Sequence, residues 1–257
     1  MFQETASVIS NHEVMPGVHL VWAESPEIAA GVRPGQFVMI SCDSGQERLL
    51  RRPISIYQVV NQSLAFIFAV AGPGTKWLAS RQAGEQLDML GPTGNHFSIN
   101  PASRNLLLVA GGLGIAPLCF LGQEALKKGC QITLLYGTRT ADQSFPEYLI
   151  PKGCDYIITT EDGTAGEAGF VTSLVPGYIE WADQVFICGP LPMYQTLVND
   201  SRSNFLNKSV EVSLELRMGC GLGFCYACTI MTRQGLKQVC KDGPVFDMNQ
   251  IIWDQLK

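Results

Sequence analysis

The chain has 257 residues, of which 46% are hydrophobic and 16% are charged, with a net charge of −5. This composition excludes a disordered chain, and the length suits two domains with a small appendage. The acidic balance and the lack of a Lys/Arg block exclude the electrostatic footprint of nucleic-acid binding. The most apolar run, Leu106–Gly122, contains four glycines and a proline, so we expect no membrane span.

Residues 1–99 carry short β-type runs separated by turn residues. We expect strands at Gly17–Ala23, Gln36–Ser41, Ile54–Val60, Leu64–Val70 and Gln86–Leu90. Because short strands at such regular spacing are typical of closed or sandwiched sheets, this segment is predicted to form a small antiparallel β-barrel.

Two segments of the predicted barrel carry groups that suit a phosphorylated ligand. In Arg51–Ser55, a guanidinium can bind a diphosphate through two hydrogen bonds, and a serine hydroxyl can bond to a flavin ring nitrogen. Two arginines before a strand are also typical of a solvated sheet edge. The glycine-rich Gly72–Lys76 could approach another phosphate or form a plain hairpin turn.

Residues 100–209 show a different pattern, in which apolar strands alternate with helical segments. Leu106–Ala110 is continuously apolar, which is typical of a strand buried on both faces, and a helix is expected over Ile115–Lys128. Further strands are expected at Gln131–Tyr136, Tyr156–Thr160 and Gln184–Cys188. This alternation predicts a doubly wound parallel α/β domain.

Two turns of this domain could contact a nucleotide. In Ala110–Pro117, glycines after a strand would let backbone N–H groups approach a pyrophosphate at the start of a helix. Tight strand–helix packing needs glycine too, and the spacing differs from the G-x-G-x-x-G fingerprint. Cys188–Pro190 ends a later strand, where ligands gather in such sheets, although the motif taken alone is explained better by a buried thiol followed by a turn.

Residues 210–257 contain four cysteines, Cys220, Cys225, Cys228 and Cys240, with the spacing C-x4-C-x2-C-x11-C. This spacing matches the loop that holds a plant-type [2Fe–2S] cluster, and the interspersed glycines permit a tight curl. Zinc modules usually present two C-x2-C pairs, and only one is present here. Disulfides would need an oxidising compartment. With no secretory signal at Met1–Thr5, the nine cysteines indicate the cytoplasm.

The combination of these motifs, in this order, resembles the ferredoxin–NADP reductase superfamily. The motifs are Arg-Pro-x-Ser in a barrel, Gly-Gly-x-Gly-x-Ala-Pro after a strand, and Cys-Gly-Pro after a later strand. The cysteine motif and the following Val239–Phe246 closely resemble the electron-transfer subunits of the class 1B dihydroorotate dehydrogenases. The resemblance covers about residues 5–250.

The resemblance implies three functional units: an FAD-binding barrel over residues 1–99, an NAD-binding domain over 100–209 and a [2Fe–2S] module over 210–257. The implied FAD contacts are Arg52, Pro53, Ile54, Ser55, Ile67, Phe68, Ala69, Gly74 and Thr75. The family pattern has a larger, often basic residue at the position of Ala69. Ala69 is therefore expected to contact FAD through its backbone only. The implied NAD contacts are Gly112, Gly114, Pro117, Cys188 and Gly189, and the cluster ligands are the four cysteines of residues 220–240.

By the same resemblance, the chain has no catalytic acid or base of its own. It would relay electrons from the FMN of a dihydroorotate dehydrogenase catalytic subunit, through [2Fe–2S] and FAD, to NAD+ in pyrimidine biosynthesis. A cytoplasmic heterotetramer of two relay and two catalytic subunits is expected.

The main alternative is an NAD(P)H-flavin subunit of a sulfite reductase, a hydrogenase or a ferredoxin:NADP transhydrogenase. Transhydrogenase subunits commonly have aspartate where Cys220 stands, which favours the dihydroorotate assignment. A redox sensor without turnover is a second alternative. NAD and NADP stay undecided, because Arg139 could meet a 2′-phosphate that Glu161 and Asp162 would repel.

Overall fold

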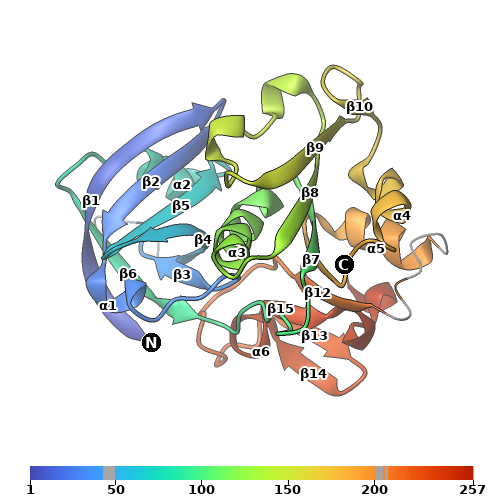
Figure 1. The fold of residues 1–257 in the computed structure, drawn as a ribbon. Helices are drawn as coiled ribbons and strands as arrows, with labels where there is room; N and C mark the ends of the chain where they lie inside the picture. The colour runs from blue at the N-terminus through green and yellow to red at the C-terminus, as the bar shows by residue number, and fades with distance from the viewer. Residues whose placement is uncertain (43–49, 201–204, 206–207, 257) are drawn as a thin grey trace.

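The structure is a computed structural model of the chain, and it describes all residues except 43–49, 201–204, 206–207 and 257 (Figure 1). The chain forms a barrel, drawn blue to cyan, beside a sheet of mostly parallel strands. The C-terminal segment, drawn red, lies below that sheet.

The barrel is closed by six antiparallel strands in the order β1-β2-β5-β4-β3-β6. They are β1 (Phe2–Met15), β2 (Val18–Glu24), β3 (Phe37–Ile40), β4 (Arg52–Val60), β5 (Ser63–Ala69) and β6 (Gln86–Thr93). Two short helices, α1 (Pro26–Ala29) and α2 (Pro73–Ala79), connect them. The predicted barrel is confirmed.

Strand β1 is the one barrel strand that the sequence pattern did not indicate. It is mostly polar, and only Ala6 and Val8 within it are buried. Nevertheless it closes the barrel, because it pairs with both β2 and β6. Pairing on both sides satisfies its backbone groups without requiring an apolar face, so hydrophobic periodicity could not reveal it.

The second body is a seven-stranded sheet in the order β10-β9-β8-β7-β11-β12-β15. Its strands are β7 (Asn105–Gly111), β8 (Gln131–Thr138), β9 (Cys154–Thr160), β10 (Glu167–Ala168), β11 (Gln184–Cys188), β12 (Ser209–Ser213) and β15 (Val245–Asp247). All pairs are parallel except β12 with β15. Its α-helices are α3 (Ile115–Lys127), the short α4 (Val175–Tyr178) and α5 (Leu191–Asn199).

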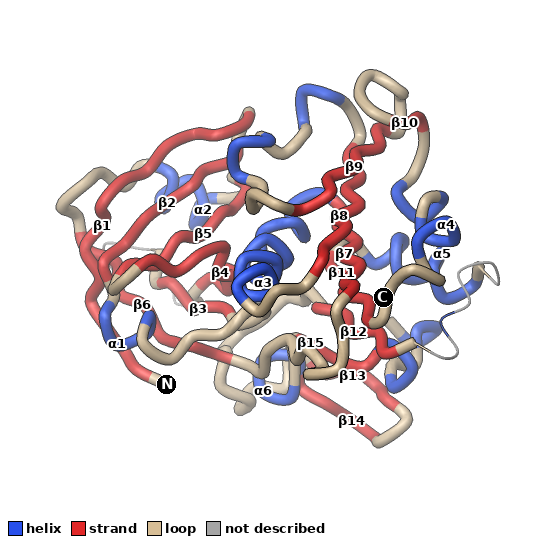
Figure 2. Tube along the Cα trace, in the orientation of Figure 1, coloured by secondary structure: helices blue, strands red, loops and turns tan. Residues whose placement is uncertain are grey.

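The two faces of this sheet are covered by different helices. Alternate residues of β7 point to opposite sides: Leu106 and Leu108 share a core with α3, whereas Leu107 and Val109 share one with α4 and α5. Figure 2 shows α3 between the sheet and the barrel, and Phe120 of α3 belongs to the barrel core. The doubly wound arrangement is therefore confirmed, and α3 joins the two bodies.

The C-terminal segment adds a small two-stranded sheet and several short helices. These are β13 (Thr229–Thr232), β14 (Gly235–Gln238), α6 (Val239–Asp242), η7 (Met248–Gln250) and η8 (Trp253–Gln255). The expected boundary at 209/210 falls in β12, and β15 returns to the large sheet. Ile230 and Val239 share a core with α4 and α5, so the module is packed into the nucleotide domain.

Among the described residues, no helix combines the length and the apolar character that crossing a membrane requires.

Candidate functional site: a flavin-type barrel, a glycine turn and a cysteine loop

The residues expected to hold FAD lie on neighbouring elements of the barrel. Arg52–Ser55 opens β4, Ile67–Ala69 ends the adjacent β5, and Gly74 and Thr75 are in α2, which follows β5. Ile54, Ile67 and Phe68 are buried in or against the barrel. Gly74 is buried as well. The other residues of the set are partly exposed: Arg52, Pro53, Ser55, Ala69 and Thr75.

Arg51 and Arg52 differ sharply in their surroundings. Arg51 pairs with Asp88 at 2.5 Å and also donates to the Asp88 carbonyl at 2.9 Å, so its role is structural. Arg52 lies against Gly74: a Cβ there would be 2.8 Å from the Arg52 Nε. No ion pair between described residues involves Arg52, whose Nη1 donates to the Leu50 carbonyl at 2.5 Å. Its remaining N–H donors suit an anionic oxygen such as that of a diphosphate.

Thr75 holds the turn before α2 in shape. Its Oγ1 accepts hydrogen bonds from the backbone N–H groups of Ala71 at 2.9 Å and Gly72 at 3.1 Å. These N–H groups would otherwise be unpaired at the start of the helix. Thr75 therefore keeps Gly74 in position against Arg52.

The two turns expected to bind NAD are in direct contact, although about 75 residues separate them. Ala110 and Cys188 are register partners at the carboxyl ends of β7 and β11. A Cβ on Gly114 would lie 2.1 Å from the Cys188 carbonyl oxygen, and one on Gly189 would lie 3.1 Å from the backbone nitrogen of Gly111. Only glycine allows this approach.

Within this pair of turns the predicted residues are not equally accessible. A Cβ on Gly112 would meet no atom within 4 Å, and its φ of +53° lies in the left-handed region that favours glycine. Pro117 is buried in the first turn of α3. Gly112 therefore has open space beside its backbone, whereas Pro117 is packed within the helix behind it.

Tyr194 supports the second turn and was not anticipated from the sequence. Its hydroxyl donates to the Ser213 carbonyl at 2.6 Å and accepts the Gly189 N–H at 3.0 Å. Its ring stacks on Trp253, with centroids 5.2 Å apart. Since Ser213 lies in β12 and Trp253 in the C-terminal segment, no local sequence signal could have indicated these two contacts.

Cys188, just before that turn, is buried. Burial, helped by the negative charge of Glu215, raises the pKa of its thiol to about 12. The group is therefore a neutral thiol at physiological pH, which makes it an unreactive neighbour for a ligand.

The cysteine loop aims backbone N–H groups at sulfur. Cys220 Sγ accepts hydrogen bonds from the N–H groups of Leu222 and Phe224, both at 3.3 Å, and Cys228 Sγ accepts one from Cys240 at 3.4 Å. Burial alone would raise the pKa of the Cys220 thiol, but these donors outweigh it and lower the pKa to about 6. A thiolate stabilised in this way is a good metal ligand.

Cys220 interacts with Cys225, and Cys240 interacts with both Cys228 and Cys220. In the described part of the chain, no group of three or more His, Cys, Asp or Glu side chains converges on a single metal position. A [2Fe–2S] cluster takes four thiolates, two for each iron. The three cysteines of the loop and Cys240 of α6 together supply the number of thiolates that such a cluster needs.

The loop packs directly against the barrel. A Cβ on Gly221 would lie 2.5 Å from Met39 Cγ, and Met39 in β3 is the register partner of Pro53 in β4. Asn95, just after β6, donates to the Val245 carbonyl at 2.7 Å and accepts the Val245 N–H at 2.9 Å. The cysteine loop is thus held against β3, which pairs with the strand that carries Arg52.

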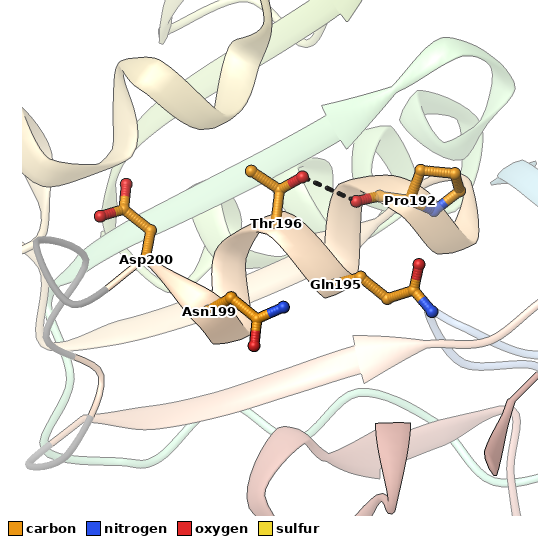
Figure 3. A pocket seen from close by; sticks show the side chains of 5 residues that line it. All are labelled: Pro192, Gln195, Thr196, Asn199 and Asp200. Carbon is orange, nitrogen blue, oxygen red and sulfur yellow. Dashed lines mark hydrogen bonds between the residues drawn. The ribbon is translucent and has the colours of Figure 1, made fainter. Parts of the chain in front are cut away.

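A surface depression lies elsewhere, along one side of α5. Figure 3 shows its lining by Pro192, Gln195, Thr196, Asn199 and Asp200. The Thr196 hydroxyl donates to the Pro192 carbonyl at 2.9 Å. The depression includes none of the residues of the three sites described above.

Together, the closed barrel, the doubly wound sheet and the cysteine loop define a ferredoxin reductase-like protein with an iron–sulfur module. Solved structures share this fold. The ferredoxin NADP+ reductase of Neisseria gonorrhoeae is 17% identical, with a TM-score of 0.62, covering 76% of this chain and 89% of that chain. The NADH-dependent reduced ferredoxin-NADP oxidoreductase structure is 29% identical, with a TM-score of 0.86, covering 98% of this chain and 91% of that chain.

Sequence comparison then specifies the family. The family model of the iron-sulfur cluster binding domain of dihydroorotate dehydrogenase B matches residues 215–252. Curated relatives from Bacillus cereus and Bacillus anthracis, each named dihydroorotate dehydrogenase B (NAD(+)), electron transfer subunit, are 35% identical over 261 residues. Each match covers 98% of this chain and 99% of the relative. The chain belongs to this family of electron transfer subunits, which confirms the resemblance found in the sequence.

Proposed function

We propose that this chain relays electrons from the FMN of a dihydroorotate dehydrogenase catalytic subunit, through a [2Fe–2S] cluster and FAD, to NAD+ in pyrimidine biosynthesis. The observation that supports the proposal is the contact between Gly221 and Met39, which brings the cysteine loop against β3, the neighbour of the strand β4 that carries the expected FAD contacts. A one-electron carrier and a two-electron acceptor need a group that can exchange either number, and FAD supplies that chemistry.

In this proposal each unit holds one group. Residues 1–99 hold FAD, residues 100–209 bind NAD, and residues 210–257 carry the cluster, with β12 and β15 completing the central sheet. Arg52 neutralises the diphosphate, the backbone at Gly112 and Gly189 meets the nicotinamide nucleotide, and Cys220, Cys225, Cys228 and Cys240 ligate iron. The chain itself supplies no acid or base to dihydroorotate.

The choice of NAD over NADP is supported by charge at the end of β9. Asp162 Oδ1 accepts hydrogen bonds from the Thr164 hydroxyl at 2.6 Å and the Thr164 N–H at 3.0 Å, which lower the pKa of its carboxyl group. The Asp162 N–H also donates to the Arg139 carbonyl at 3.3 Å, so the two expected ribose-side residues are neighbours. A fixed carboxylate there disfavours a 2′-phosphate.

The partner and compartment are part of the same proposal. The partner would be the FMN-containing catalytic subunit, in a heterotetramer of two relay and two catalytic chains. Phe224 and Tyr226 on the cysteine loop are 78% and 68% exposed, which suits an interface close to the cluster. A cytoplasmic location is supported by the absence of any disulfide among the described cysteines.

An alternative relay deserves a direct test, because the 29% identical neighbour is an NADH-dependent reduced ferredoxin-NADP oxidoreductase. Such a chain would hold the same groups but exchange electrons with ferredoxin. The relatives at 35% identity and the matched cluster-domain family favour dihydroorotate.

The first experiment is an anaerobic absorbance spectrum of the purified chain, with iron, sulfide, zinc and flavin content, before and after NADH. About two irons and one FAD per chain, bleached by NADH, are expected. Zinc without iron or flavin would refute the relay.

The second experiment adds the FMN-containing catalytic subunit and follows dihydroorotate-dependent reduction of NAD+. Cys225→Ala should abolish this transfer while NADH still reduces the flavin. Reduction of ferredoxin, with no electrons accepted from the dihydroorotate subunit, would establish the alternative.

A further inference from the structure

The side chain of Gln238 is a buried amide beside the cysteine loop. Gln238 is the last residue of β14, pairs in register with Thr229, which follows Cys228, and precedes Cys240 by two positions. It is only 8% exposed. Its Nε2 is fully buried and has no hydrogen-bond acceptor in the part of the chain that the structure describes.

The amide is held against the loop by tight packing. A Cβ on Gly223 would lie 2.8 Å from Gln238 Oε1 and 2.8 Å from Lys241 Cδ. Gly223 has a φ of +82°, so the loop passes Gln238 in a conformation that favours glycine. The oxygen end of the Gln238 amide therefore lies against the cysteine loop at Gly223, and Gln238 is two residues before the fourth cysteine.

A buried N–H donor without an acceptor is unusual, because native proteins pair nearly all such groups. The acceptors expected in this place are sulfur atoms, either thiolates of the cysteines or sulfides of the cluster that the proposed function requires. The loop already directs three backbone N–H groups at Cys220 and Cys228. A fourth donor, from a side chain, would extend this pattern to the Cys240 end of the site.

We propose that Gln238 donates a hydrogen bond from its amide to a sulfur of the bound cluster and thereby raises the cluster's reduction potential. The inference rests on the proposed function, since it requires [2Fe–2S] at the four cysteines. Reduction adds one electron to the cluster and increases the negative charge on its sulfurs. A hydrogen bond to sulfur is therefore stronger in the reduced state and favours it.

The test uses Gln238→Met, which keeps a flexible side chain of similar length but removes the N–H donors. The matched control is Gln234→Met, an exposed glutamine in the same hairpin. The cluster's potential is measured by anaerobic redox titration with EPR detection of the reduced cluster, and the flavin's potential in the same samples is the internal reference.

Gln238→Met should shift the balance toward the oxidised cluster about tenfold, which for one electron is a potential lower by about 59 mV. The flavin's potential and the control variant should be unchanged. Equal cluster potentials in wild type and Gln238→Met would overturn the inference.

A second readout needs no variant. In wild-type protein carrying 15N in its glutamine side chains, pulsed EPR of the reduced cluster should detect a weak hyperfine coupling from the Gln238 nitrogen. Absence of that coupling, with the cluster intact, would overturn the inference and leave the relay standing. Wild-type protein without iron would instead overturn the proposed function itself.

Discussion

The contact between the cysteine loop and the barrel predicts the effect of Gly221→Ala. Gly221 adopts a φ of +70°, and a Cβ there would lie 2.5 Å from Met39 Cγ and 2.8 Å from Met39 Sδ. Met39 is completely buried, so its side chain has little room to move away. The substitution therefore combines a strained backbone with a steric overlap.

The two costs can be separated by a control in the same module. A left-handed backbone costs an alanine about 1–2 kcal/mol, and overpacking a buried contact costs about 1–3 kcal/mol more. Gly235 has a φ of +97°, but a Cβ there would meet no atom within 4 Å. Gly235→Ala should therefore lower the free energy of unfolding only by the cost of the strained backbone. The loss for Gly221→Ala should be larger than that by about 1–3 kcal/mol.

The assay is anaerobic urea unfolding of the loaded protein, followed by far-UV circular dichroism and by cluster absorbance. The urea midpoints of the variants are compared with that of the wild type. The comparison requires that the two probes give the same unfolding transition and that the variants have the same m-value. In a Met39→Ala background, Gly221→Ala should cost less, because the overlapping side chain is gone. Equal losses for the Gly221 and Gly235 variants, or no relief in the Met39→Ala background, would refute the proposed packing of the loop on the barrel.

Two further predictions concern the nucleotide turn and the junction between domains. Gly114→Ala would place a Cβ 2.1 Å from the Cys188 carbonyl oxygen. It should slow flavin reduction by NADH in stopped-flow at unchanged flavin and iron content, whereas Gly177→Ala, with open space around it, should not. Burial, and the negative charge of Asp247, outweigh the Ser98 N–H bond and raise the pKa of Glu211 to about 7. Because the folded protein binds this proton more tightly than the unfolded chain does, the contribution to stability is full below the ordinary glutamate pKa and is lost as pH rises through about 7. Wild type should therefore lose stability relative to Glu211→Gln between pH 5 and 8; parallel urea midpoints across that range would contradict the prediction.

The sequence indicated the barrel, the sheet and the cysteine loop because each depends on local patterns. Leu106–Ala110 is apolar throughout because both faces of β7 are covered. The cysteine spacing is visible because one short loop supplies three of the four thiols. The glycine turn of Ala110–Pro117 was visible as a candidate nucleotide site. Tight packing between a strand and a helix explained its glycines equally well.

Features that depend on distant partners could not be read in this way. Arg51 and Arg52 are adjacent and chemically identical, yet only the first pairs with Asp88, which the closure of the barrel brings beside it. The contact of Gly114 with Cys188 depends on β7 and β11 being neighbours, which is a matter of strand order.

The sequence by itself determined which groups this protein carries. It places four thiols at the spacing of a cluster site, glycines in the turns where two backbone segments come close together, and apolar runs that form strands. The tertiary structure alone decided how these parts are joined. Asn95 ties the end of the barrel to Val245, Met39 meets Gly221, and Tyr194 bonds to both Gly189 and Ser213. The physical reason is that local conformation follows from neighbouring residues, whereas these contacts form only after strands far apart in the chain have paired.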